Sequence, residues 1–445
     1  MTWDNPLWQE LLPLGRDQST GGYRRYTFTE ADSSCRDWFI KAAGERFLRV
    51  ECDAVGNLWA WWLVSEDPDS GGGGGTPVAP AAGATPRATD MPSPQVRRAK
   101  GGNGSEVIGG VVAGSHLDSV PDGGAFDGPL GVVSAFLAID RLRERGFRPV
   151  RSIGVAAFIE EEGARFGTAC LGSKVLTGVV EADAARRLVD AQGVTFAEAM
   201  LGAGLDPDGL GAGAGLPQRL AAFVELHVEQ GSALDGLGAA VGIGESIWPH
   251  ERRRIEFAGR ADHAGTTAIK DRRDPMLPFA ATVLAARDAA TEFGARATMS
   301  KVVPVPGGAN GICSAVHAWL DARAADEQTL DGLVARVMQT AHAEGDRHQV
   351  TVTSRRESFT QKVEFDLDLR DRVATALARQ GVTAPVLPTG AGHDAGVLAA
   401  VLPTAMLFVR NRTGVSHSPA EHAEPADCEA GVDALAVVLE ELASR

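Results

Sequence analysis

The chain has 445 residues, too many for one simple hydrophobic core, so we expect two domains. Its 43 basic and 58 acidic residues give a net charge of −15, which argues against nucleic acid and anionic membranes as partners. Five scattered cysteines without CxxC spacing indicate free thiols in a reducing compartment. The first residues lack a signal-peptide pattern, and no apolar run is long enough to span a membrane. We therefore expect a cytoplasmic protein.

The first hundred residues predict a helix over 28–48 and two short strands within 49–64. Residues 66–104 are mostly Gly, Pro, Ala and small polar residues. Such a segment cannot bury enough apolar surface to offset the entropy of ordering it. We interpret it as a flexible insertion between two strands, with a functional lid as the alternative.

Strand and helix patterns alternate from residue 106 onward. Strands are predicted over 106–115, 151–163 and 221–231, and a helix over 128–146. Apolar strands that alternate with helices predict an α/β sheet with parallel character, and ligands of such sheets bind beyond the carboxyl ends of the strands. Polar clusters follow each of these strands.

A different pattern occupies residues 242–355, which we expect to form an inserted second domain. Its strands are predicted over 251–260, 295–307, 315–324 and 347–356, and its helices over 274–294 and 326–345. The order strand–helix–strand–strand–helix–strand is the ferredoxin-like (α+β) arrangement. Residues 1–241 and 356–445, with a helix over 367–381, would then form the two parts of the first domain.

The stretch "GSHLDSVPDGGAFDGPLG" (114–131) ends a predicted buried strand with His116. A metal-binding imidazole usually donates its other N–H to a carboxylate, and Asp118 can be that partner because it points to the same side in an extended segment. Glycines around Asp127 allow the backbone to return that carboxylate to the same place. A structural role for His116 is the alternative.

Acidic and imidazole side chains also follow the other predicted strands. Glu160, Glu161 and Glu162 close one strand; they are either a solvated charge run or a metal ligand beside a free base. "VELHVEQG" contributes His227, and "GVSHSPAEH" contributes His417. Together with His116 and Asp127 these carboxylates and imidazoles, without thiolate, suit two divalent ions such as Zn, Mn, Co or Ni if Asp127 bridges them.

These motifs, with "DHAGTT" and "GAGHDA", resemble in order and spacing the di-metal aminoacylase and carboxypeptidase-like amidohydrolases. The resemblance is to the branch that cleaves ureido compounds, which includes N-carbamoyl-L-amino acid hydrolases and allantoate amidohydrolases. It spans about residues 20–440 except the insertion, and it implies a mixed-sheet catalytic domain with an inserted domain that acts as a lid and forms a homodimer.

The resemblance also implies roles for individual residues. His116 and His227 match the ligands of one metal, Glu162 and His417 those of the other, and Asp127 the bridge. His227 stands where the peptidase relatives place a carboxylate, which supports the ureido branch. Glu161 matches the general base, and His263 matches a histidine that stabilises the oxyanion, usually across the dimer. Residues that match substrate contacts are Gln230, Asn310, Arg323 and Gly392.

Several positions depart from the family pattern: Ala268 and Ile269 after "DHAGTT", Cys313, and Arg410–Asn411–Arg412 before His417. Arg410 and Arg412 could hold a second carboxylate, so we hypothesise an acidic substrate such as an N-carbamoyl or N-formyl derivative of glutamate or aspartate. Surface arginines are the alternative for these two residues, and a strand-end salt bridge is the alternative for Arg323.

The sequence thus predicts a ureido hydrolase that acts on a small substrate with a carboxylate. Two other functions are the alternatives. One is a dipeptidase or aminoacylase that uses the same site on peptide-type amides. The other is a binding protein that kept the fold and lost catalysis, which the presence of every expected ligand and of the base argues against.

Overall fold

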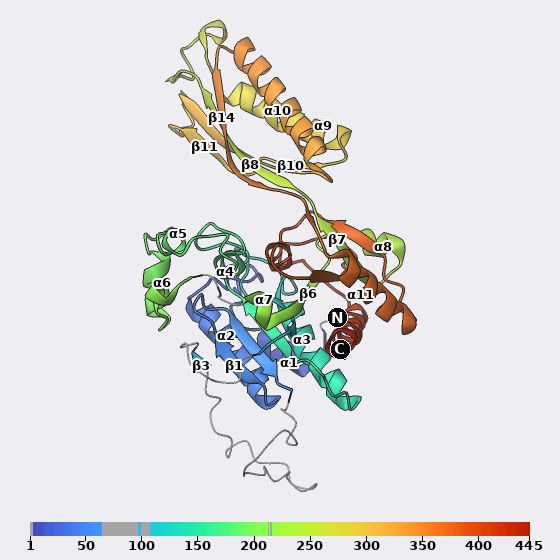
Figure 1. Ribbon diagram of the computed structural model, residues 1–445. Helices are drawn as coiled ribbons and strands as arrows, with labels where there is room; N and C mark the ends of the chain where they lie inside the picture. Colours follow the sequence, from blue (N-terminus) through green and yellow to red (C-terminus); the bar gives the residue numbers. More distant parts are fainter. Residues whose placement is uncertain (1–2, 65–96, 99–106, 212, 214–215) are drawn as a thin grey trace. The chain divides into compact units, whose positions relative to one another are not determined.

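The computed structural model describes residues 3–64, 97–98, 107–211, 213 and 216–445 (Figure 1). The predicted insertion at 66–104 lies outside the described residues except for Arg97–Arg98. The chain divides into two compact units: Met1–Glu245, Phe365–Leu387 and His393–Arg445 form unit 1, and Ser246–Glu364 and Pro388–Gly392 form unit 2. Each unit is described by itself.

The larger sheet has ten strands in the order β15-β7-β17-β6-β4-β5-β2-β1-β3, with β16 beside β7. Its centre is parallel, because β4 runs parallel to β5 and β6, and β17 runs parallel to β6. The flanking strands β2 and β7 are antiparallel to their neighbours β5 and β17, so the sheet is mixed. The strands are β1 Arg49–Cys52, β2 Leu58–Trp62, β3 Arg97–Arg98, β4 Gly110–His116, β5 Ile153–Phe158, β6 Leu220–Val228, β7 Val241–Ile247, β15 Val363–Glu364, β16 Val386–Thr389 and β17 Thr404–Val409.

The central strands are buried because helices and loops cover them. Every residue of β4, β5 and β17 is buried, as expected for strands that read as continuous apolar runs. Helices α3 and α13 pack against each other and against β4 and β6 in one apolar core. The helices of unit 1 are α1 Pro6–Leu11, α2 Glu30–Glu45, α3 Pro129–Glu144, α4 Leu171–Leu176, α5 Ala182–Arg186, α6 Phe196–Gly202, η1 Pro207–Gly209, α7 Leu216–Arg219, α8 Ala233–Leu237, α11 Leu367–Arg379, α12 Asp394–Leu398 and α13 Pro425–Ala443.

Unit 2 contains an antiparallel sheet in the order β10-β13-β8-β14, with β11 also paired to β13. This order, with two helices packed on the sheet, is that of a ferredoxin-like fold (Figure 1). The segment 295–307, predicted as one strand, forms two, and β14 extends past residue 356 because it stays paired to β8. The elements are β8 His250–Ala258, β9 Asp262–His263, η2 Ile269–Asp271, α9 Met276–Glu292, β10 Arg296–Thr298, β11 Val302–Val305, β12 Gly311–Ile312, β13 Ala315–Arg323, α10 Glu327–Arg347 and β14 Thr351–Thr360.

The described residues bear on the expected free cysteines and on the search for membrane-spanning segments. All five cysteines are free, as predicted, and all are buried. No helix in the described part of the chain is long and apolar enough to cross a bilayer.

Candidate metal centre and active site

Two histidines at the ends of neighbouring parallel strands direct their Nε2 atoms to the same place, and that of His227 accepts the main-chain N–H of Gly128 at 3.2 Å. His116 ends β4, and its Nδ1 atom lies 3.1 Å from the carbonyl oxygen of Asp118. His227 lies in β6, and its Nδ1 atom lies 2.8 Å from the carbonyl oxygen of Val228. A carbonyl can only accept, so the hydrogen of each ring is on Nδ1 and Nε2 keeps a lone pair. Both side chains are almost completely buried.

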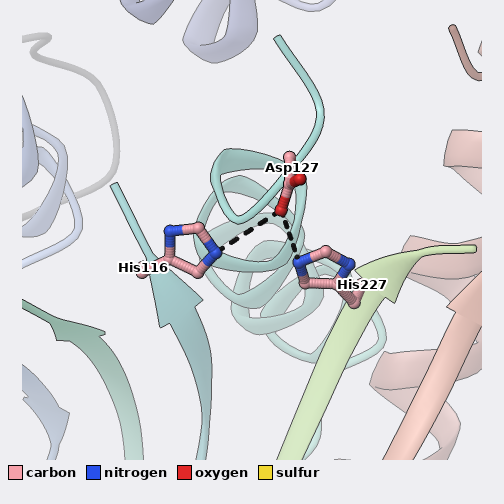
Figure 2. A group of neighbouring side chains, drawn as sticks. All are labelled: His116, Asp127 and His227. Atoms are coloured by element: carbon pink, nitrogen blue, oxygen red, sulfur yellow. Dashed lines mark ion pairs between the residues drawn. The ribbon is translucent and has the colours of Figure 1, made fainter. Parts of the chain in front are cut away.

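Asp127 lies between these two histidines (Figure 2). Its Oδ1 atom is 3.1 Å from Nε2 of His227 and 3.6 Å from Nε2 of His116. Its other oxygen, Oδ2, is 3.3 Å from Nε2 of His417. Nε2 of His417 is in turn 3.7 Å from the Glu162 carboxylate.

The ligand atoms therefore form two groups that share one carboxylate. Among the described residues, His116, Asp127 and His227 form one group, and Asp127, Glu162 and His417 form the other. Within each group the atoms lie within 4.8 Å of one another. A single aspartate whose two oxygens face two sets of ligands is the arrangement that a bridged pair of cations requires.

Gly128 makes room for this cluster. Its φ of 85° is in the left-handed region, and a Cβ atom there would lie 2.4 Å from Cε1 of His116. Any side chain at this position would displace the His116 ring, so the glycine after Asp127 is required by the site itself.

The three consecutive glutamates after β5 point to different places because their backbone turns sharply. Glu160 has a φ of 50°, and its carboxylate accepts the main-chain N–H groups of Arg165 and Phe166. Asp118 accepts the N–H of Glu161 at 3.2 Å and that of Glu162 at 3.1 Å. Glu160 is thus a structural residue, and Asp118 orients the backbone that carries the other two glutamates.

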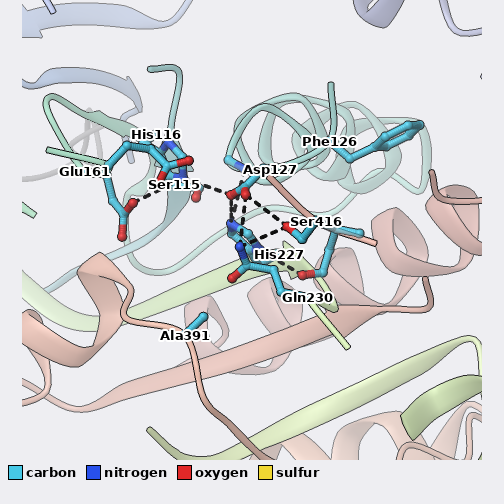
Figure 3. Close-up of polar contacts among 12 residues, drawn as sticks. Ser115, His116, Phe126, Asp127, Glu161, His227, Gln230, Ala391 and Ser416 are labelled. Atoms are coloured by element: carbon cyan, nitrogen blue, oxygen red, sulfur yellow. Dashed lines mark hydrogen bonds and ion pairs between the residues drawn. The ribbon is translucent and has the colours of Figure 1, made fainter. Parts of the chain in front are cut away.

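Glu161 lies beside the first group without belonging to it. Its Oε2 atom is 3.7 Å from Nε2 of His116, and its side chain is 7% exposed (Figure 3). The thiol of Cys170 donates a hydrogen bond to its Oε1 atom at 3.2 Å. A buried carboxylate next to a cation site but outside its ligand set is placed as a general base would be.

Burial and close charges shift the pKa values at this centre. Burial raises the pKa of Glu162 to about 7, and the nearby Asp127 charge acts in the same direction. Burial also opposes ionisation of Asp127, but the three imidazoles around it, those of His116, His227 and His417, lower the pKa of this carboxyl well below its usual value. The hydrogen bond to Asp127 raises the pKa of His417 to about 9.

The donor set fits divalent cations. The buried atoms His116 Nε2 and Glu162 Oε1 have no hydrogen-bond partner among the described residues, although buried polar atoms normally have one. A cation in each group would satisfy both atoms. Imidazole and carboxylate donors without thiolate suit borderline ions such as Zn²⁺ and Mn²⁺.

Unit 2 holds the predicted oxyanion histidine in a defined tautomer. The exposed His263 accepts the main-chain N–H groups of Gly265 and Thr266 at its Nδ1 atom, at 3.0 and 3.2 Å. In the neutral ring the hydrogen is therefore on Nε2, which is a donor. The exposed Asn310 lies next to His263, because Gly311 pairs with His263 and the carbonyl of Asn310 accepts the N–H of Ala264.

Arg323 ends β13 of the five-stranded sheet, whereas His263 belongs to the two-stranded sheet β9–β12 near the start of β13. Its guanidinium pairs with Asp321 at 2.9 Å and donates to the carbonyl oxygen of Gly390 at 2.7 Å. The strand-end salt bridge considered from the sequence is thus present. Ala315 and Arg323 pair with Ala258 and His250, so eight strand steps, or about 27 Å, separate the His263 end of β13 from Arg323. Gly392 is exposed, and apart from its chain neighbours no described residue lies within 4 Å of where its Cβ atom would be.

Arg410 has an acidic partner within the protein. Its Nε and Nη2 atoms donate to the two oxygens of Asp427, at 2.9 and 2.7 Å, and both side chains are mostly buried. Asp427 at the start of α13 therefore occupies the Nε–Nη2 edge of this guanidinium, which favours a structural role, and the substrate contact stays a prediction. Arg412 is exposed.

Gln230, a predicted substrate contact, lies at this centre (Figure 3). Several residues that the sequence analysis did not single out lie there too. Gln230 donates to Oδ2 of Asp127 at 2.9 Å and to Ser416 at 3.2 Å. The buried His393 packs its ring 4.5 Å from that of His227. The buried Glu225 accepts hydrogen bonds from Ser115 and from the N–H of Ala395. No periodicity could identify such residues, because their role depends on which distant segments pack together.

Comparison with known proteins decides the family. The model of peptidase family M20/M25/M40 matches residues 112–441. The chain belongs to this family. It is 33% identical over 432 residues to N-carbamoyl-L-amino acid amidohydrolase of Geobacillus stearothermophilus, covering 96% of each chain. Allantoate amidohydrolase of Escherichia coli is also 33% identical, over 351 residues, which are 77% of this chain and 83% of that one.

Solved structures agree with this assignment. An amidase of the hydantoinase/carbamoylase family from Burkholderia vietnamiensis has a TM-score of 0.80 and 26% identity, with 98% of this chain and 96% of that chain covered. The expected mixed α/β fold and the resemblance to ureido-cleaving amidohydrolases are confirmed, and the chain is a hydrolase of this family.

Proposed function

We propose that this chain is a metal-dependent amidohydrolase that cleaves a linear C–N bond of a ureido or N-acyl amino acid, with N-carbamoyl-L-amino acids and allantoate as the two leading substrates. The single observation that supports this most is Asp127, whose Oδ1 faces His116 and His227 and whose Oδ2 faces His417. The names of the relatives supply the substrate class.

His116 and His227 would hold one divalent ion, Glu162 and His417 a second, and Asp127 both. When bound, such ions lower the pKa of water and polarise a carbonyl group. Glu161 takes a proton from the attacking water, since its carboxylate is beside the ligand cluster but outside it. The same carboxyl group then delivers the proton to the leaving nitrogen, so the amine leaves neutral.

His263 would donate its Nε2–H to the oxyanion, because the N–H groups of Gly265 and Thr266 keep Nδ1 an acceptor. Asn310 would hold the substrate beside it, Arg323 would bind the substrate carboxylate, and the Gly392 backbone and Gln230 would complete the contacts. Arg323 would have to leave part of its pairing with Asp321 to do so.

We further propose that the active enzyme is a homodimer with shared sites, in which unit 2 acts as lid and dimerisation domain. About 27 Å of strand separate the His263 end of β13 from Arg323, which is far longer than a carbamoyl amino acid. One substrate can contact both residues only if they come from different copies of the chain.

The test is a substrate panel on metal-free protein reloaded with Zn²⁺, Mn²⁺, Co²⁺ or Ni²⁺. It compares allantoate, neutral and acidic N-carbamoyl-L-amino acids, N-formyl-glutamate, N-acetyl amino acids and dipeptides, and it measures ammonia and the freed amine. Ammonia released with the ureido substrates supports the proposal. Amine released only from dipeptides or N-acetyl amino acids would favour an aminopeptidase or aminoacylase. Metal uptake without any turnover would favour a binding protein.

A further inference from the structure

Glu421, in the motif "SPAEH", is a buried carboxylate that the proposed mechanism does not use. It is 5% exposed, and no lysine or arginine pairs with it among the described residues. Its Oε2 atom accepts the main-chain N–H groups of Phe126 and Asp127, each at 2.9 Å. Its Oε1 atom accepts the hydroxyl hydrogen of Ser416, also at 2.9 Å.

These contacts join two loops that lie about 290 residues apart in the sequence. One loop carries Asp127, the carboxylate shared by both ligand groups, and the other carries His417 next to Ser416. The hydroxyl oxygen of Ser416 lies 3.3 Å from Oδ2 of Asp127 (Figure 3). Glu421 therefore contacts the backbone of one ligand and the neighbour of another, without contacting a ligand side chain.

The loop that carries Asp127 leaves room for the Glu421 carboxylate at Gly124. A Cβ atom at Gly124 would lie 2.2 Å from Oε2 and 2.5 Å from Cβ of Glu421. The ring of Phe126 in the same loop stacks on Trp8 with centroids 4.9 Å apart. The N–H groups of residues 126 and 127 thus reach Glu421 only because residue 124 has no side chain.

We propose that Glu421 is a positioning residue. It sets the metal affinity of the centre by fixing the loop that carries Asp127 and the loop that carries His417 relative to each other. The inference rests on the proposed metal-dependent function. Residues that orient metal ligands typically contribute about 10- to 100-fold in affinity, and here the shared ligand would transmit the effect to both groups.

Three substitutions can separate the effect of the Glu421 hydrogen bonds from the effect of its charge. In Glu421→Gln the amide oxygen can still accept both N–H groups, and the amide nitrogen can donate to Ser416, whose hydroxyl then points to Asp127. Glu421→Ala removes all three contacts. Gly124→Ala leaves the carboxylate in the chain but occupies its place with a Cβ atom.

The experiment titrates metal-free wild-type and variant proteins with Zn²⁺, and separately with Mn²⁺, against a chromophoric chelator, after circular dichroism has confirmed folding. We expect Glu421→Ala and Gly124→Ala to bind two equivalents about 10- to 100-fold more weakly, and Glu421→Gln to stay within about threefold of wild type. The control is Glu424→Ala, which removes a half-exposed carboxylate three residues along the chain that pairs with His422 at 3.7 Å, and it should match wild type.

Wild-type affinity in the folded Gly124→Ala and Glu421→Ala proteins would overturn the proposal. An equal loss in Glu421→Gln and Glu421→Ala would also overturn it, because charge rather than geometry would then be responsible. If Glu421→Ala does not fold, the other two variants are the test. Weaker binding in Gly124→Ala with near wild-type binding in Glu421→Gln supports the proposal, and any other result overturns it. Failure of the wild-type protein itself to bind either metal would instead refute the proposed function.

Discussion

The thiol of Cys170 donates a hydrogen bond to Oε1 of Glu161, with 3.2 Å between sulfur and oxygen. The main-chain N–H of Cys170 also bonds to the carbonyl oxygen of Glu161. Cys170 has a φ of 54° and is nearly completely buried, so side chain and backbone together fix where the proposed base points. This contact gives the first prediction.

Cys170→Ser keeps a donor at this position and Cys170→Ala removes it. Because the alanine variant frees the Glu161 carboxylate to rotate, we expect its kcat to fall severalfold while metal content and KM stay unchanged. The serine variant should retain most of the activity. Steady-state kinetics with metal analysis measures this, and equal kcat values for alanine and wild type would show that the thiol does not position the base.

Glu161→Gln and Glu162→Gln should differ although the residues are adjacent. Glu161→Gln should lower kcat by about 100-fold or more and keep both metal equivalents, because a base is lost but no ligand. Glu162→Gln should lose one equivalent, since its carboxylate faces His417. Metal content by mass spectrometry, together with turnover, distinguishes them. Normal turnover by Glu161→Gln would remove this residue as the base.

His263→Ala should lower turnover by roughly 100- to 1000-fold without changing metal content, the usual cost of one oxyanion donor. In the wild-type protein, long-range proton–nitrogen spectra of labelled histidine should show the hydrogen of His263 on Nε2. Gly265→Ala keeps the main-chain N–H and should keep this tautomer. A spectrum with the hydrogen on Nδ1 would contradict the hydrogen bonds at Gly265 and Thr266.

Mixing inactive variants tests the shared site. If His263 and Arg323 of one site come from different copies, mixed His263→Ala and Arg323→Ala proteins should recover about a quarter of wild-type activity, because half of the dimers then have one intact site of two. The control mixes His263→Ala with Asn310→Ala. Both residues lie together at the β9–β12 pair of unit 2 and so come from the same copy, which means that no intact site can form. Recovery in the control but not in the test mixture would exclude the proposed arrangement.

Arg410→Ala should affect stability rather than selectivity. It leaves Asp427 buried without its partner, so we expect a loss of about 3 kcal/mol in the free energy of unfolding. The ratio of kcat/KM for acidic and neutral N-carbamoyl amino acids should not change. Denaturant unfolding and the substrate panel measure the two effects, and a selective loss of activity on acidic substrates would instead support Arg410 as a substrate contact.

Much of the fold could be predicted because it depends on local pattern. The apolar runs that became β4, β5, β6 and β17 are continuous in the sequence, and strands buried on both sides require such runs. The order of strands and helices in unit 2 followed from alternation in the same way. The division of 295–307 into two strands did not, since it depends on pairing with the distant β13.

The sequence by itself determined that histidines and carboxylates follow the ends of several buried strands, and that glycines surround Asp127. Only the tertiary structure decided which oxygen of Asp127 faces which histidine, why Glu160 points away from the centre, and that Asp427 engages Arg410. The physical reason is that strand position follows from residue type and spacing along the chain. The direction of a side chain depends instead on the segments packed against it, which come from far away in the sequence.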